Sequence, residues 1–236
     1  MNLRATLACA TAIAGLALSS PALADAITLD SSNIGDSFTV NYDGFADGNP
    51  IDGLTGTATF TLTGISGSSY MFDYSVSNTS SMGVDSRISS FAFDVDPSIT
   101  GASSTGDFPF TVLDSNYPNG IGNVDVCFKG GSSNSCAGNS GGVTAGNTGS
   151  GSLSLDFAGG SPNAITLDDF FVRYQSITGA GNVTSASGSG TISSTGGSTG
   201  GTPVPEPGML GLLGLGLAGL AFARGRARRK MVPAAA

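Results

Sequence analysis

Eight short runs of this sequence alternate apolar and polar residues, and this period of two constrains the fold more than any other feature. In an extended strand, residues spaced by two share one face. Gly, Asn, Asp and Ser separate the runs, as expected for turns. The sequence therefore predicts an all-β protein, an antiparallel β-sandwich of about eight or nine strands. The apolar members of the runs are Phe38, Val40 and Tyr42; Ala58, Phe60 and Leu62; Tyr70, Phe72, Tyr74 and Val76; Phe91, Phe93 and Val95; Phe108, Phe110 and Val112; Val124, Val126 and Phe128; Leu153, Leu155 and Phe157; and Phe170, Val172 and Tyr174.

The runs fall between residues 25 and 178, which is enough chain for one domain with a real core. Inside that span, residues 130–151 are rich in Gly, Ser and Asn, so we expect a long mobile loop there. Residues 179–202 are rich in Gly, Ser and Thr and read as a flexible linker. The first half of this linker, NVTSASGSGTI, would add at most a weak edge strand.

Residues 1–24 have the pattern of a secretory signal peptide. Arg4 supplies the positive charge, residues 5–18 form the apolar stretch, and Ala22-Leu23-Ala24 gives the small-x-small cleavage pattern. We expect the Sec machinery to export the chain and signal peptidase to cut between Ala24 and Asp25. The mature protein would then lie outside the inner membrane.

The C-terminal segment, residues 203–230, has three parts in a fixed order. A proline-locked tetrapeptide is followed by the uncharged apolar run of residues 208–223 and then by a basic cluster. As a helix the apolar run spans about 24 Å, so it predicts a single transmembrane helix slightly shorter than a bilayer core. Flanking Lys and Arg stay cytoplasmic, which fixes its orientation. The tetrapeptide is Val204, Pro205, Glu206 and Pro207, and the cluster is Arg224, Arg226, Arg228, Arg229 and Lys230.

This order of parts resembles the PEP-CTERM sorting signal of Gram-negative bacteria, with the signature at Pro205, Glu206 and Pro207. One departure is the short tail of residues 231–236 after the basic cluster. The resemblance implies an exosortase as partner, a transient inner-membrane anchor, and a final place at the cell surface or in an exopolysaccharide or biofilm matrix. An ordinary C-terminal membrane anchor with a proline-rich stalk is the alternative.

Two internal segments are similar to the cistern family of PEP-CTERM proteins. They are residues 167–176, LDDFFVRYQS, and Asp52-Gly53-Leu54 before the run TATFTL. That family has no established biochemical activity, so this resemblance implies a classification and little mechanism.

Charge is divided unevenly along the chain. Residues 25–207 hold three basic residues, Arg87, Lys129 and Arg173, against all seventeen acidic ones, a formal net charge of −14. Such a surface excludes nucleic acid as a natural partner. Sixteen of the acids are Asp, a turn former, so solubility and turns explain much of this charge.

Two cysteines, Cys127 and Cys136, remain after signal-peptide removal. In an oxidising compartment this pair is expected to form a disulfide at the base of the Gly-rich loop. The sequence has no His, so a zinc site or an activated thiol is unsupported.

The aspartates offer two further hypotheses. Asp43, Asp47 and Asp52 cluster in a turn-rich segment that could wrap Ca²⁺, although their spacing is not that of an EF-hand and turn formation explains them equally well. Asp94 and Asp96 share one side of a strand and would suit a carboxylate-based hydrolase. No other cofactor is indicated.

The leading interpretation is a non-enzymatic structural or interaction protein that an exosortase processes. A secreted carbohydrate- or calcium-binding module is the alternative, and a hydrolase comes after both.

Overall fold

The structure is a computed structural model that describes residues 25–138 and 140–196. Most of this part of the chain is β-strand, with one 3-10 turn, η1 (Ser31–Asn33), and none of its helices is long and apolar enough to cross a membrane. The signal peptide and the sorting segment lie outside the described residues. The strands are β1 (Ile27–Asp30), β2 (Ser37–Ala46), β3 (Asn49–Ser66), β4 (Ser69–Asn78), β5 (Asp85–Asp96), β6 (Gly101–Ser104), β7 (Phe110–Tyr117), β8 (Gly122–Lys129), β9 (Val143–Thr144), β10 (Thr148–Asp156), β11 (Ala164–Thr178) and β12 (Ser185–Gly196).

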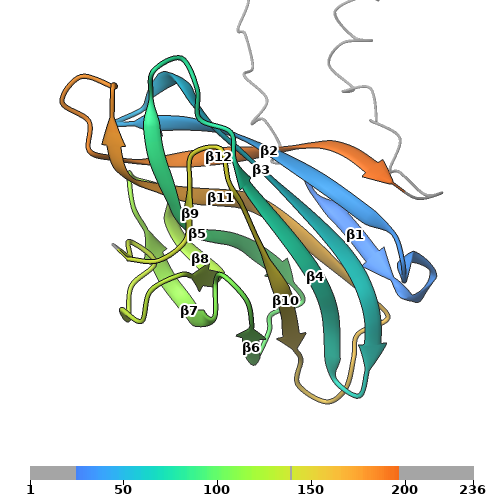
Figure 1. The fold of residues 1–236 in the computed structure, drawn as a ribbon. Helices are drawn as coiled ribbons and strands as arrows, with labels where there is room; N and C mark the ends of the chain where they lie inside the picture. The colour runs from blue at the N-terminus through green and yellow to red at the C-terminus, as the bar shows by residue number, and fades with distance from the viewer. Residues whose placement is uncertain (1–24, 139, 197–236) are drawn as a thin grey trace, which may run out of the picture.

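All strand pairs are antiparallel and belong to one sheet, in the order β6-β10-β4-β3-β2-β12-β11-β5-β8-β7. β1 pairs with β11 and β9 pairs with β5 beside this path. The sheet curls until its two edge strands, β6 and β7, come into contact, which gives a nearly closed, barrel-like shape (Figure 1). The predicted all-β antiparallel fold is confirmed, and its layers are parts of one continuous sheet.

The inner face of the curled sheet is packed with aromatic rings. The ring of Phe60 on β3 contacts those of Phe38 on β2, at a centroid distance of 5.2 Å, and Phe91 on β5, at 5.7 Å. Phe91 in turn contacts Phe128 on β8 at 5.1 Å. Each such pair contributes about 0.5–1.5 kcal/mol beyond the area it buries. The alternating runs thus converge on one core, as their pattern predicted.

β12 corrects the interpretation of residues 179–202. This strand lies between β2 and β11 in the middle of the sheet, whereas the sequence indicated a linker with at most an edge strand. Three of its inward residues, Ala186, Gly188 and Gly190, are small, and a Cβ at Gly188 would lie 2.8 Å from Cγ2 of Val172 and 2.9 Å from Cε2 of Tyr174. Rings and methyl groups of the neighbouring strands fill the space below β12, so the strand carries no apolar run of its own.

Two smaller expectations also change. The loop expected at residues 130–151 ends before β9, and β10 already begins at Thr148. Phe108 and Phe110 do not share a face, because β7 begins only at Phe110. Phe108 is fully buried beside Tyr74 and Phe91, whereas Phe110 is 41% exposed.

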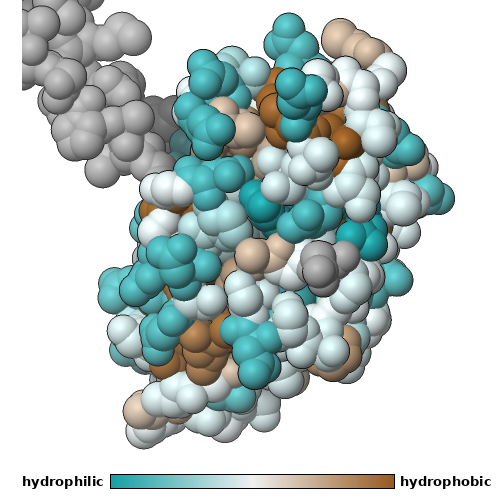
Figure 2. Space-filling model, turned by 90° about the vertical axis from the view of Figure 1, so that its left-hand side faces the viewer, coloured by the Kyte–Doolittle hydropathy of each residue, from teal (hydrophilic) through white to brown (hydrophobic). Residues whose placement is uncertain are grey.

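The outside of the molecule is mostly polar. On the face in Figure 2, apolar side chains gather in small separate patches among hydrophilic ones. Small scattered patches of this kind are normal on a soluble domain.

Candidate functional site

The predicted sorting residues are not described by the structure. Val204 to Pro207 and the basic cluster from Arg224 to Lys230 lie outside the described residues, as does Ala24 of the cleavage site. Asp25 is described, and its carboxylate accepts a hydrogen bond of 2.9 Å from the backbone N–H of Ile192 on β12. The expected first residue of the mature chain therefore lies against the last strand of the domain.

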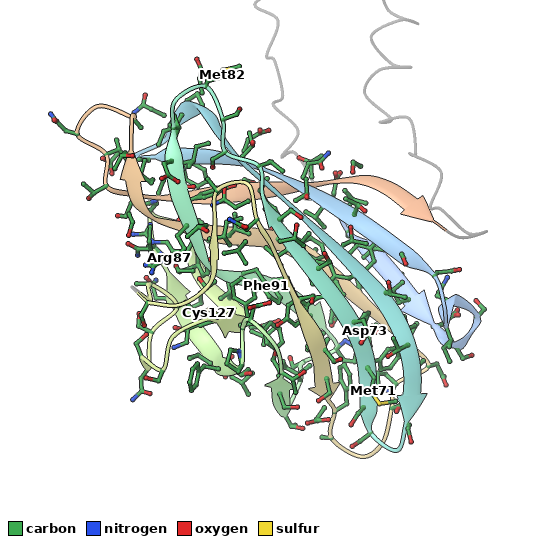
Figure 3. All side chains as sticks on the ribbon, in the orientation of Figure 1. Met71, Asp73, Met82, Arg87, Phe91 and Cys127 are labelled. Atoms are coloured by element: carbon green, nitrogen blue, oxygen red, sulfur yellow. A yellow bond between two sulfur atoms is a disulfide. The ribbon has the colours of Figure 1, made fainter. Side chains whose placement is uncertain are left out.

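Cys127 and Cys136 form a disulfide, with their Cα atoms 6.0 Å apart (Figure 3). Both residues are fully buried, in a small second cluster with Ala92, Tyr117 and Val124. The cluster lies on the outer side of β5 and β8, behind the main core. The disulfide fixes the loop after β8 onto this side of the sheet.

Further contacts anchor the loop around Cys136, so it is not the free loop that its composition suggested. Ser90 Oγ donates to the carbonyl oxygen of Cys136 at 3.0 Å, and Gln175 Nε2 donates to that of Ala137 at 2.7 Å. Lys129 Nζ donates to Ser135 O at 3.3 Å, and burial lowers the pKa of this ammonium group. The region serves as a packed cover for the sheet.

Asp94 is the most perturbed carboxyl on the outer surface, and its partner is Asp125. Asp94 Oδ1 accepts from the backbone N–H of Asp125 at 2.9 Å, and Asp125 Oδ2 accepts from that of Val95 at 2.8 Å. Regular β5–β8 pairing ends at Phe93 and Val126. The two carboxylates therefore continue the connection between strands that no longer pair through their backbones. Asp96, the partner indicated by the sequence, is exposed at the end of β5.

The surroundings of Asp94 disfavour its charged form. Burial, followed by repulsion from Asp125, Asp169 and Asp168, raises its pKa to about 6, although the N–H of Asp125 opposes the shift. Burial and the charge of Asp169 also raise the pKa of Asp168. A carboxyl with a pKa near 6 beside an ionised one is typical of a general acid in a glycosidase. Here, however, both Asp94 and Asp125 also brace backbone amides.

The calcium hypothesis gains no support from the structure. Asp43, Asp47 and Asp52 are all exposed. Among the described residues, no three Asp, Glu, Cys or His side chains come together in an arrangement that could hold a metal ion. Asp47 has a positive φ of 50°, so it has the turn role that was the alternative interpretation.

A surface of ordered hydroxyl groups covers the outside of β2, β3, β4 and β10. The polar members of the alternating runs already carry the signal of this surface, which was not among the predicted sites. We call it the hydroxyl face, and define it by Ser37, Thr39, Thr57, Thr59, Thr61, Thr63, Ser75, Ser77, Thr148, Ser150, Ser152 and Ser154.

The strand register aligns these side chains in rows across the strands. Thr59 lies between Thr39 on β2 and Ser75 on β4, and Ser75 lies beside Ser150 on β10. Neighbouring hydroxyl groups bond to each other, as at Thr39–Thr59 (2.9 Å) and Ser77–Thr148 (2.7 Å). Rows are about 6.7 Å apart along a strand and members of a row about 4.8 Å apart across strands. The result is a regular polar lattice held by a rigid sheet.

Comparison with known families assigns the C-terminal segment. Residues 203–229 match the family model of the PEP-CTERM protein-sorting motif. This chain carries a PEP-CTERM sorting motif. The match includes Pro205, Glu206, Pro207, the apolar run and nearly all of the basic cluster, so the predicted resemblance is confirmed. The motif implies that the protein is exported with a membrane-passing sorting signal and that an exosortase is its processing partner.

The comparisons give no further assignment for the domain. Neither a curated protein nor a solved structure matches the chain. The resemblance of residues 52–54 and 167–176 to the cistern family stays a prediction, because the family match covers the tail alone.

Proposed function

We propose that the mature PEP-CTERM protein is a non-enzymatic structural or interaction protein. An exosortase releases it from a transient inner-membrane anchor, and it then acts at the cell surface or in the exopolysaccharide matrix. The observation that carries the proposal is the sorting motif at residues 203–229. The motif indicates how the protein is processed, and it indicates no chemical activity of the domain.

The arrangement around Asp94 supports a role without catalysis. Its carboxylate and that of Asp125 are each engaged with a backbone N–H of the other strand. A buried or half-buried carboxylate that bonds to backbone amides is a common structural device. The hydrolase alternative has the raised pKa of Asp94 in its favour, and loss of a glycan-cleaving activity in Asp94→Asn would support it.

The sorting step is tested with Glu206→Ala in the native host. Glu206 lies between the two prolines of the matched motif, and it is the only Glu in the chain. We expect the variant to accumulate as full-length precursor in the inner membrane, while the unmodified protein loses the segment from residue 208 onward. Mass spectrometry of the C-terminal peptide in exosortase-positive and exosortase-negative strains measures both.

Thr202→Ala is the matched control, because it lies just outside the motif and should be processed normally. N-terminal sequencing of the same exported material should begin at Asp25. A permanent anchor predicts a different result: residues 208–223 would remain on the native protein in both strains, and that finding would contradict the proposal.

A further inference from the structure

We infer that the hydroxyl face binds a neutral glycan, centred on a groove between β4, β10 and β6. This inference rests on the proposed function, because it supplies a partner for an interaction protein. Sugars present many hydroxyl groups and a few apolar C–H faces, so a complementary protein surface combines hydrogen-bonding groups with limited apolar area. The groove has that composition.

The groove has a volume of about 320 Å³, and six of its ten lining residues carry a hydroxyl group. Its members include Thr63, Ser103, Ser152 and Ser154, together with one carboxylate, Asp73, and one exposed apolar side chain, Met71. Met71 and Asp73 occupy successive outward positions of β4 (Figure 3). Met71 is 37% exposed, and its flexible thioether would pack against the apolar face of a sugar ring.

The polar groups of the groove are already oriented. Ser152 Oγ donates to Asp73 Oδ1 at 2.8 Å, which leaves the other carboxylate oxygen of Asp73 available to accept from a ligand hydroxyl. Ser103 and Ser154 bond through their hydroxyl oxygens at 2.9 Å. Side chains held in one geometry lose little conformational entropy on binding. Hydroxyl groups that each form only a modest hydrogen bond can therefore still bind a ligand specifically.

Charge selects the class of glycan. Residues 25–196 include sixteen aspartates and three basic residues, and those three, Arg87, Lys129 and Arg173, lie on β5, β8 and β11, away from the hydroxyl face. An acidic polysaccharide would therefore meet repulsion without a compensating cation. A strongly cationic partner would find only Asp73 as a carboxylate within the groove. A neutral, hydroxyl-rich chain avoids both problems.

The test uses the exported protein purified from the native host, run in native gels that contain a soluble glycan. The neutral probes are a mixed-linkage β-glucan and dextran, and the acidic probe is alginate. We expect at least one neutral probe to retard the protein and alginate to have no effect. Asp73→Asn should weaken binding about fivefold, because a charged acceptor makes a stronger hydrogen bond than an amide oxygen. Met71→Ala should weaken it as well.

Asp52→Asn is the matched control, since it neutralises an exposed carboxylate on β3 outside the groove and should bind normally. Failure of both neutral probes, equal retardation by alginate, or equal effects of the changes at Asp73 and Asp52 would each overturn the inference. None of these results would affect the sorting proposal, because the Glu206 experiment measures C-terminal processing alone.

Discussion

Asp94→Asn should make the protein more stable at neutral pH, which is an unusual result for removing a hydrogen-bonded carboxylate. The surroundings raise the pKa of Asp94 from 3.8 to about 6. A raised pKa means that the folded protein binds this proton more tightly than the unfolded chain does. The stability from this proton is fully present below the unfolded pKa and is lost as pH rises through the folded value.

The expected magnitude follows from that difference. A full shift from 3.8 to about 6 corresponds to about 3 kcal/mol between protonated and ionised forms. Asp94 is partly exposed, so water and salt screen the effect, and we expect about 1 kcal/mol. Asn keeps an oxygen that accepts from the N–H of Asp125, so the brace between β5 and β8 survives. The gain should appear at pH 7 and vanish at about pH 3, where Asp94 is largely protonated in both states.

Urea unfolding of the purified protein at pH 3, 5 and 7 measures this difference. The comparison between variant and unmodified protein cancels the titration of the other carboxylates, provided that the slope with urea is unchanged. Asp52→Asn, the same substitution at an exposed position of β3, serves as the control. A loss of stability at pH 7 in Asp94→Asn, or a difference that does not depend on pH, would refute the reasoning.

Two further predictions test the packing. Replacing both Cys127 and Cys136 by Ala should cost about 2–3 kcal/mol of unfolding free energy, because the short loop is no longer closed in the unfolded chain, and should expose the loop to limited proteolysis; an unchanged denaturation midpoint would contradict this. Gly188→Ala should destabilise by about 1–3 kcal/mol, measured by urea unfolding, because its methyl group would crowd Val172 and Tyr174. Ser189→Ala on the exposed side of β12 is its control, and equal losses in both variants would show that crowding is not the cause.

The sequence predicted those strands that carry their own apolar residues. β3, with TATFTLT, and β4, with Tyr70 to Val76, show the alternation because each presents one face to the core. β12 was not predicted, because its glycines mainly leave room for the side chains of Val172 and Tyr174. A strand made mostly of Ser, Gly and Thr resembles a linker in sequence.

The candidate sites were also hard to predict where they depend on which strands lie side by side in the fold. Asp94 was recognised as a candidate from the strand that carries it. Asp125 was missed, because only the pairing of β5 with β8 brings it there. The sorting motif is a continuous stretch of sequence, so it could be recognised without any knowledge of the fold.

The central place of β12 has a consequence for the order in which the protein folds during export. A secreted chain emerges with its N-terminus first, so β2 and β11 appear outside before the strand that joins them. Their facing edges stay unpaired until β12 has passed through the membrane, and the sheet cannot close earlier. Only residues 197–202 separate β12 from the matched sorting motif, a reach of about 20 Å when fully extended. The domain would thus complete its sheet within that distance of the sorting motif.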